Sequence, residues 1–311
     1  MKKAFLFSLG LVVALSSLFV SCSDNNGDDD KNDSLICKIS VSSTNGGSAE
    51  ITNYIGFSAN VLIGNGVEVV ATPDDGYNFL GWFVANSNKP VNTEATYTFT
   101  VSENVALVAK FEKIRTYLNG YEYVDLGLPS GVKWATFNVG ATTPEEYGGY
   151  YAWGETEEKE NYSWSTYKWC NGGENTMTKY CIDSDYGTVD NKTVLEPEDD
   201  VAHVKWGGSW RMPTKTEQDE LRSKCTWQWT TLNGVNGYNV TGPNGNSIFL
   251  PAAGCRSGTG VYDRGNYGNY WSGSLYSIYG NSAYYLSFYD NYYDWYRNDR
   301  YYGQSVRPVI E

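Results

Sequence analysis

A 27-residue segment, Tyr276 to Tyr302, constrains the fold more than any other part of the chain. Ten of its residues are Tyr, Asn, Ser and Asp supply three each, and it lacks Lys, Glu, Gln, Met, His, Cys and Pro. Strands favour aromatic residues and are depleted in Lys and Glu. Leu286-Ser287-Phe288 alternates, as expected for a strand whose Leu and Phe point towards a core. The segment therefore predicts β structure.

The same composition is typical of a binding surface. Tyr provides a large, rigid contact area at low entropic cost, and Ser, Asn and Gly provide adaptable hydrogen bonding. Arg and Trp are common hot-spot residues. The alternative is a tyrosine-rich β region on an extracellular domain without a binding role. We predict ligand contacts from Tyr276, Tyr279, Tyr285, Tyr289, Asp290, Tyr292, Tyr293, Asp294, Tyr296, Arg297, Asn298, Asp299, Tyr301 and Tyr302.

The rest of the composition limits the classes of function. The chain has 311 residues, enough for two domains, and its 33 Gly suit turn-rich β structure. A net charge of −13 argues against a nucleic-acid partner and an anionic membrane face. His203 is the only His, so His triads and multi-His metal sites are not expected, and we interpret it as structural.

Six cysteines are present, and none forms a CxxC pair, which excludes a zinc ribbon by spacing. Cys170 with Cys181, and Cys225 with Cys255, could form disulfides in an exported protein. Alternatively these cysteines are free and act as small buried hydrophobic residues. The sequence leaves both possibilities open.

The N-terminus is typical of an exported protein. Residues 1–21 carry two lysines followed by an apolar run, 4–20, which is too short for a stable membrane span. The run ends in LFVSC at 18–22, which resembles the lipobox of bacterial lipoproteins, although Phe19 departs from the usual smaller aliphatic residue. The resemblance implies that Cys22 is lipidated and anchors the protein. Plain secretion is the alternative.

Residues 22–34 form an acidic segment that contains SDNNGDDDKNDS. It has almost no apolar area to bury, so we predict a disordered tether. The segment resembles the acidic signal that follows the lipidated Cys in surface-exposed lipoproteins of the Bacteroidetes. That resemblance implies an outer membrane lipoprotein displayed on the cell surface.

Residues 35–113 predict a small all-β domain. The expected strands are 36–41, 67–71, 97–101 and 105–111, with a turn at 72–76. The strings ATPDDGYNFLGWF and TYTFTVSENVALVAKFE resemble the bacterial repeat family related to the internalin B-repeat. The resemblance implies a β-grasp-like module that serves as a spacer or an adhesion accessory, without catalytic residues, and we expect a plain stalk.

Residues 114–311 carry signals for few helices. Thr143-Pro144-Glu145-Glu146 predicts a helix start, and the capping-box spacing of Thr214 and Glu217 predicts a helix over 215–224. Asn233-Gly234 and Asn236-Gly237 predict hairpin turns, and 247–256 predicts a buried strand meeting a turn.

Several separated strings in this region occur in a recognisable order: YVDLGLPSGVKWATFNVGA, YYAWGET, GGSWRMPTKTEQDEL, NYWSGS and GQSVRPV. Together they resemble, over about 121–311, the family named after the Fibrobacter succinogenes major paralogous domain, in its Bacteroidetes form. That family is similar to the C-type-lectin-like fold of formylglycine-generating enzymes. The resemblance implies an α+β domain with few helices and an irregular antiparallel sheet.

The same resemblance offers an enzyme interpretation that the residues do not support. Formylglycine-generating relatives use two closely spaced cysteines late in the domain, and here Cys255 has no such partner. The carboxylate pairs Glu196/Glu198 and Asp199/Asp200 are expected by chance in so acidic a chain and do not indicate a glycosidase. We predict no enzymatic activity and no cofactor.

A calcium site is also not predicted. The C-type-lectin sugar motifs are matched only partly, by Glu196-Pro197-Glu198 and Asn298-Asp299. Asp183, Asp185 and Asp190 could bind a hard cation through oxygen, but they lack EF-hand spacing, so we expect a solvated loop.

The C-terminal segment also resembles the targets of diversity-generating retroelements, in which mutation at template adenines rewrites a binding surface. An Asn codon changed at its adenines can give Tyr, Asp, Ser, Gly, Ile or Arg, but not Lys, Glu, Gln, Met or Trp. The segment fits this rule except at Trp295, which would be invariant. Further framing positions would be Leu286, Phe288, Arg300, Gly303 and Val306.

We therefore predict a surface lipoprotein that binds a macromolecular protein or glycan ligand through 276–302, with a diversified sequence. Replacing Tyr292, Tyr293 or Tyr296 by Ala is expected to weaken binding and leave stability nearly unchanged. The alternatives are a fixed glycan-binding module and, disfavoured by the missing Cys pair, a formylglycine-generating type of enzyme.

Overall fold

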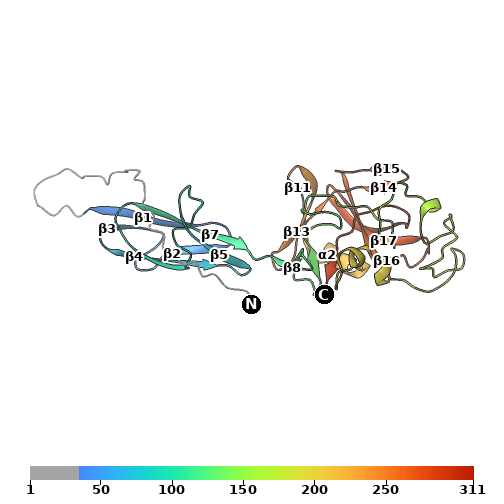
Figure 1. Cartoon of the computed structure of the whole chain (residues 1–311), viewed down its shortest axis with the longest axis horizontal. Coiled ribbons are helices and arrows are strands. Elements are labelled where there is room, and N and C mark those ends of the chain that lie inside the picture. Colours follow the sequence, from blue (N-terminus) through green and yellow to red (C-terminus); the bar gives the residue numbers. More distant parts are fainter. Residues whose placement is uncertain (1–34) are drawn as a thin grey trace, which may run out of the picture. The chain divides into compact units, whose positions relative to one another are not determined.

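The computed structural model of the protein describes residues 35–311. The predicted signal sequence at 1–21, the lipidation site at Cys22 and the tether at 22–34 lie outside the described residues. The described chain divides into two compact units, one that ends at Ile114 and one from Arg115 to Glu311 (Figure 1). None of the described helices is long and apolar enough to cross a membrane.

The first unit consists of two small β-sheets over residues 35–113. Its strands are β1 (Ile36–Ser43), β2 (Gly47–Ile51), β3 (Ser58–Leu62), β4 (Gly66–Pro73), β5 (Tyr77–Val84), β6 (Thr96–Thr100) and β7 (Val105–Lys113). One sheet has the order β3-β1-β7-β5, with β1 parallel to β7, and the other is the antiparallel sheet β2-β4-β6. The four strands predicted from the sequence are confirmed as β1, β4, β6 and β7.

The core of the first unit follows from alternation. Along β1 and β4 every second side chain is buried, including those of Ile39, Val67 and Val69. Trp82 on β5 is fully buried in the same cluster, and its indole Nε1 donates to the Ala95 carbonyl at 3.3 Å. Aliphatic alternation and one large aromatic residue therefore account for this core.

The second unit is built from short strands and two helices. In chain order its elements are β8 (Thr116–Leu118), β9 (Tyr121–Asp125), β10 (Lys133–Ala135), the 3-10 turns η1 (Trp164–Thr166) and η2 (Pro197–Asp199), α1 (Val201–Trp206), α2 (Lys215–Lys224), β11 (Thr226–Leu232), β12 (Val235–Thr241), β13 (Ser247–Pro251), β14 (Cys255–Ser257), β15 (Gly260–Tyr262), β16 (Tyr267–Leu275), β17 (Ser282–Tyr289), β18 (Tyr292–Asp299) and β19 (Val309–Ile310). The sheets are β19-β10-β9-β8, β11-β12-β13, β14-β15 and β16-β17-β18.

The predicted α+β class with a C-type-lectin-like domain is wrong. Of the described residues, 45% lie in strands and 8% in helical turns, and the strands form several separate sheets. The physical reason is that uninterrupted runs of helix-forming residues are short. The helices α1 and α2 have only six and ten residues. The protein is therefore a β-rich fold.

The two helix predictions had opposite outcomes. The helix over 215–224 is confirmed as α2, and Thr214 and Glu217 form the predicted capping box. No helix follows Thr143. The Glu146 carboxylate caps this turn by accepting from the Thr142 backbone N–H at 2.6 Å, but Gly148 then adopts φ 72° and reverses the chain. A side chain on Gly148 would meet the Val139 carbonyl, so this glycine is required for the reversal.

The two turn predictions also differ. Asn233-Gly234 joins β11 to β12 with φ of 49° and 86°, as predicted for a two-residue hairpin turn. Asn236-Gly237 is not a turn and lies inside β12. A Cβ on Gly237 would be 2.3 Å from the Leu250 carbonyl oxygen, so this Gly permits close approach of two strands. The predicted buried strand before residue 256 is confirmed as β13.

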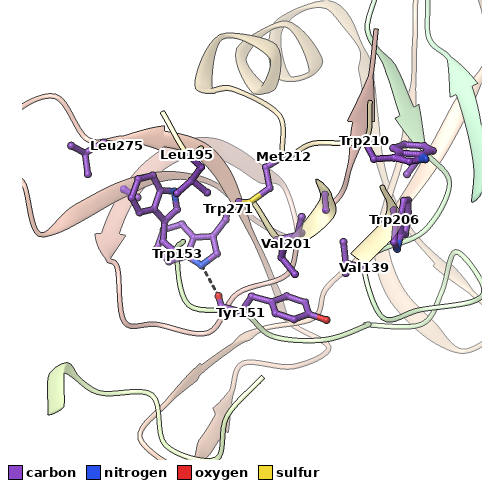
Figure 2. Close-up of a cluster of buried hydrophobic side chains, with 14 of the residues drawn as sticks. Val139, Tyr151, Trp153, Leu195, Val201, Trp206, Trp210, Met212, Trp271 and Leu275 are labelled. Carbon is purple, nitrogen blue, oxygen red and sulfur yellow. Dashed lines mark hydrogen bonds between the residues drawn. The ribbon is translucent and has the colours of Figure 1, made fainter. Parts of the chain in front are cut away.

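Buried tryptophans form the centre of the second unit (Figure 2). The Trp271 indole N–H donates to the Tyr151 carbonyl at 2.9 Å, and the Trp153 indole N–H donates to the Ser272 carbonyl at 2.8 Å. These bonds satisfy the indole groups and connect β16 to the segment around Tyr151. The helix α2 packs against β16, β17 and β18, so the C-terminal sheet is held on a rigid base.

Candidate functional site

The predicted binding segment folds as a β-hairpin at the edge of a three-stranded sheet. β17 and β18 pair in antiparallel register from Ser282↔Asp299 to Tyr289↔Tyr292. The turn residue Asn291 has φ 66°, a left-handed conformation that Asn adopts more readily than most residues. The strand predicted at Leu286-Ser287-Phe288 is confirmed.

One face of this sheet carries three cross-strand rows of side chains. Residues directly opposite each other on neighbouring strands share a face. Read from β16 to β18, the rows are Tyr267–Tyr289–Tyr292, Asn269–Ser287–Asp294 and Trp271–Tyr285–Tyr296. Two aromatic rows therefore flank one polar row. We call Tyr267, Tyr285, Tyr289, Tyr292 and Tyr296 the tyrosine face.

Ring contacts join the tyrosine face into one surface. Ring centroids are 5.0 Å apart for Tyr267 and Tyr289, 5.2 Å for Tyr289 and Tyr292, and 6.3 Å for Tyr285 and Tyr296. The hydroxyl oxygens of Tyr292 and Tyr296 are 2.8 Å apart. The hydrogen bond with Tyr296 raises the pKa of Tyr292 to about 12.

The rings of this face are partly open to solvent. Tyr267, Tyr289 and Tyr296 are 38%, 40% and 44% exposed. Ser287 and Asn269 are buried in the polar row, where the Ser287 hydroxyl donates to Asn269 Oδ1 at 3.1 Å. The polar row between the aromatic rows is therefore internally satisfied. Tyr267, Tyr289 and Tyr296 keep part of their ring surface open, whereas Trp271 at the start of the second aromatic row is fully buried.

The opposite face of the hairpin is structural. Leu286 and Phe288 are buried in the core that includes Tyr238, and Gly268 leaves room for the Phe288 ring. Tyr293 lies on this face and stacks on Trp227, with ring centroids 4.6 Å apart and an interplanar angle of 12°. The prediction that Tyr293 contacts ligand is therefore not supported by its position.

Other predicted site residues gather at the far end of the hairpin. The Arg297 guanidinium lies over the Tyr279 ring at 4.6 Å and the Tyr276 ring at 5.4 Å. Beside them a cavity of about 430 Å³ opens at the surface. It is lined by Glu174, Asn175, Asp185, Tyr186, Tyr279, Asn281, Arg297 and Asp299. We call it the Arg297 cavity.

The remaining predicted residues have separate environments. Asp290 is exposed in the hairpin turn. Asp294 Oδ1 accepts from the Trp295 N–H at 2.8 Å and lies 3.6 Å from Arg222 of α2, while Asn298 Oδ1 accepts from the Asp299 N–H at 3.0 Å. These side chains satisfy backbone donors on the outer edge of β18.

The two last predicted residues leave the hairpin. Tyr301 packs edge-on against Trp164, with centroids 4.8 Å apart, and stacks on Tyr302 at 4.6 Å. Tyr302 packs against the tryptophan-rich core. The structure thus divides the predicted site between the tyrosine face, the Arg297 cavity and residues with packing roles.

Arg300, predicted as a framing residue, holds the base of the hairpin. It is fully buried, and its guanidinium donates to the Tyr167 hydroxyl at 2.8 Å and to the carbonyls of Gly280, Lys179 and Tyr180 at 2.9, 3.0 and 3.1 Å. The fork geometry of the guanidinium allows it to join several backbone segments at once.

The cysteines considered for disulfides are thiols. Cys170, Cys181, Cys225 and Cys255 are all free in the structure, so neither predicted pair is bonded. Cys170 Sγ donates to the Trp164 carbonyl at 3.1 Å, and Cys181 Sγ donates to the Asp183 carbonyl at 3.1 Å. Burial raises the pKa of Cys225 and Cys255 to about 11, so both are poor nucleophiles at neutral pH.

Asp190, Asp199 and Asp200, three of the acidic residues weighed for catalysis or cation binding, have structural contacts. Asp200 caps α1 by accepting from the backbone N–H groups of Ala202 and His203. His203, which we interpreted as structural, is a residue of this helix. Asp199 is buried and accepts from Lys179 Nζ at 2.6 Å and from the Tyr180 hydroxyl at 2.8 Å.

One carboxylate oxygen from each of Glu196, Glu198 and Asp199 lies within 4.8 Å of the other two. The ammonium group of Lys179 forms ion pairs with all three carboxylates. The Asp190 carboxylate accepts from the N–H groups of Tyr180, Cys181 and Lys192. The carboxylates of Glu196, Asp199 and Asp190 thus each have at least one hydrogen-bond donor within the described residues.

Sequence reasoning missed Tyr267 of the tyrosine face because it lies outside the composition-defined segment. The alternation of Tyr267, Asn269 and Trp271 along β16 was the available signal. It also missed Glu174, Asn175 and Tyr186 of the Arg297 cavity. These residues come from an irregular segment that is distant in the sequence. Hydrophobic periodicity locates only helices and strands, so it could not predict where their side chains lie.

Comparisons with known proteins identify the first unit. The family model of the divergent InlB B-repeat domain matches residues 38–115, which confirms the predicted N-terminal repeat. No curated protein matches the chain. The search of solved structures also gave no match.

Proposed function

We propose that this protein is a ligand-binding protein whose tyrosine face contacts a macromolecule. The observation that carries the proposal is the cluster of partly exposed rings of Tyr267, Tyr289 and Tyr296 on β16, β17 and β18. A flat, partly exposed aromatic surface anchored on a satisfied sheet is pre-organised, so little conformational entropy is lost when a partner covers it.

The expected energetics are those of a protein interface. Covering the exposed rings removes apolar area from water, which contributes roughly 25 cal/mol for each Å² buried. Tyr hydroxyls at the ring edges can exchange hydrogen bonds with the partner. Asp290 and Asn298 supply a polar rim around the aromatic centre. No covalent chemistry is needed.

We also propose that the segment is sequence-diversified. Four of the positions assigned to an invariant frame are tightly packed: Leu286, Phe288, Arg300 and Val306 are at most 2% exposed. Trp295, also assigned to the frame, is half-buried and packs edge-on against Tyr284. Gly303 has no room for a side chain beside the Tyr162 ring. Among the tyrosines proposed to vary, Tyr289 and Tyr296 are exposed. Tyr293, Tyr301 and Tyr302 instead pack against other aromatic rings.

The proposed setting is the cell surface. A lipid on Cys22 would anchor the chain in the outer membrane, and the acidic tether and the B-repeat unit would separate the second unit from the membrane. This part of the proposal rests on the N-terminal sequence and is tested by metabolic labelling with a fatty acid in the wild type and in Cys22→Ser. Labelling of both proteins would refute lipidation at Cys22.

The binding proposal is tested on arrays of cell-surface proteins and glycans, probed with the purified protein and with the double variant Tyr292→Ser/Tyr296→Ser. Tyr117→Ser is the matched control, because Tyr117 is 55% exposed on β8 and lies outside the tyrosine face. Signals that the control keeps and the double variant loses support the proposal. Signals kept by both variants would place binding elsewhere.

Diversification has its own test in the DNA that flanks the gene. We expect a second copy of the segment encoding about 270–309, which differs from the first only where it carries adenine, next to a reverse transcriptase gene. If no such copy is found, the tyrosine face is fixed and has one partner.

A further inference from the structure

The Arg297 cavity is separate from the tyrosine face. Arg297 and Asp299 come from β18, Tyr279 and Asn281 come from the segment before β17, and Glu174 and Tyr186 come from the irregular segment before α1. The strand β18 thus serves two surfaces, because its alternate side chains point to opposite faces. Tyr292 and Tyr296 belong to one face, and Arg297 belongs to the other.

The hydrogen-bonding groups in this cavity are available. Within residues 35–311, the carboxylates of Glu174, Asp185 and Asp299 and the guanidinium of Arg297 form no hydrogen bond or ion pair with protein side chains. The Tyr186 and Tyr279 hydroxyls likewise have no protein partner there, although their rings lie 6.0 Å apart. The cavity therefore offers unused donors, unused acceptors and two aromatic rings.

This combination distinguishes between ligand classes. An anion needs donors only and would leave the carboxylates unused. A metal ion needs oxygen ligands that converge on one point. Among the described residues, only Glu196, Glu198 and Asp199 form such a group, and they lie outside this cavity. An organic cation would use the carboxylates and the rings but would leave the Arg297 donors unpaired. A polyol hydroxyl donates and accepts at once, so it can use both the carboxylates and the guanidinium.

We propose that the Arg297 cavity binds a neutral sugar residue of a glycan. Sugar hydroxyls would donate to Asp299 and Glu174 and accept from Arg297, and the apolar face of the ring would lie against Tyr279 or Tyr186. The volume of about 430 Å³ accommodates one sugar ring with room for its neighbours in the chain. The excess of carboxylates over guanidinium groups disfavours acidic sugars.

The pKa of Asp299 lies above its ordinary value. Burial raises it, the nearby Glu174 charge raises it further, and Arg297 lowers it. Asp299 and Glu174 both line the cavity and accept no hydrogen bond from the described side chains, so ligand hydroxyls that donate to them gain hydrogen bonds. The geometry of the cavity, and not this shift, identifies the ligand class.

The test is a titration of the ¹⁵N-labelled protein with glucose, galactose, mannose and N-acetylglucosamine, with glucuronate and lysine amide as charged comparisons. We expect saturable chemical-shift changes at the amides of Tyr186, Asn281 and Asp299 with at least one neutral sugar. Glu174→Ala and Arg297→Ala should each weaken that binding about tenfold, as expected for the loss of a hydrogen bond to a charged group.

Two controls separate this proposal from the tyrosine face. Tyr292→Ser should leave sugar binding unchanged, whereas Glu174→Ala should leave macromolecule binding by the tyrosine face unchanged. Both cavity substitutions are at exposed positions, so loss of folding is not expected. The absence of saturable shifts with every neutral sugar, or equally tight binding of glucuronate or lysine amide, would overturn the proposal.

Discussion

Tyr293 stacks on Trp227 with ring centroids 4.6 Å apart, while Tyr292, the preceding residue, bonds through its hydroxyl to Tyr296 on the other face of the hairpin. Adjacent tyrosines in one sequence run therefore have different roles. Composition predicted a binding surface for the whole run, but only the strand register divides it into a packed face and an exposed face.

This division predicts different stability effects within the run. Tyr293→Ala should lower the free energy of unfolding by about 2–3 kcal/mol because a stacked, half-buried ring is lost. Tyr296→Ala should lower it by less than about 1 kcal/mol because the ring is largely exposed. Urea unfolding of both variants measures the difference. Equal losses would show that the register-based division is wrong.

Arg300 is expected to be essential for folding of the second unit. Arg300→Ala should cost at least about 3 kcal/mol, because three buried carbonyls and the Tyr167 hydroxyl lose their donor. Arg300→Lys should restore little, because an ammonium group cannot span the same fork of acceptors. The matched control is Arg297→Ala, three residues earlier and exposed, which should leave the melting temperature nearly unchanged. A small effect of Arg300→Ala would contradict this role.

Position 237 inside β12 is expected to require a residue without a side chain. Gly237→Ala should destabilise the protein by about 2 kcal/mol or more, because the new Cβ would lie 2.3 Å from the Leu250 carbonyl oxygen. Gly66→Ala on β4 is the control, because a Cβ there meets nothing within 4 Å. Thermal unfolding should separate the two variants clearly. A neutral Gly237→Ala would refute the close strand approach.

Tyr285 gives a prediction at alkaline pH. Burial raises its pKa to about 12, above the value of about 10 expected in the unfolded chain. The folded protein holds the phenol proton of Tyr285 more tightly than the unfolded chain does. The stability of the protein is therefore unaffected by this group below pH 10 and falls as pH rises from 10 towards 12, where the unfolded chain loses the proton first. Tyr285→Phe should therefore reduce the loss of stability over that range. Identical pH dependence in both proteins would argue against a buried Tyr285 hydroxyl.

Local signals in the sequence predicted much of the local structure. Strand-like residue patterns located β1, β4, β6 and β7, the capping box located α2, and Asn233-Gly234 located the turn between β11 and β12, because each depends on residues close in the chain. The architecture of the second unit was not predicted. Its short strands join sheets through contacts between distant segments, and the resemblance used for residues 114–311 indicated the wrong fold class.

The candidate site was predicted in outline and not in detail. The segment from Tyr276 to Tyr302 contains most of the tyrosine face, but Tyr267 joins it only through the pairing of β16 with β17. Gly148 shows a case in which a local signal was present but the predicted helix did not form. A helix start at Thr143 ended in a reversal because the chain must pass close to Val139, and no local pattern encodes that contact.

The most direct test of the central claim is a dissociation constant measured together with a melting temperature for Tyr292→Ala/Tyr296→Ala, using a ligand found on the arrays. The account predicts binding weakened by at least about tenfold, with a melting temperature close to that of the wild type and of the control Tyr117→Ala. Unchanged affinity in a stably folded double variant would contradict the assignment of ligand binding to the tyrosine face.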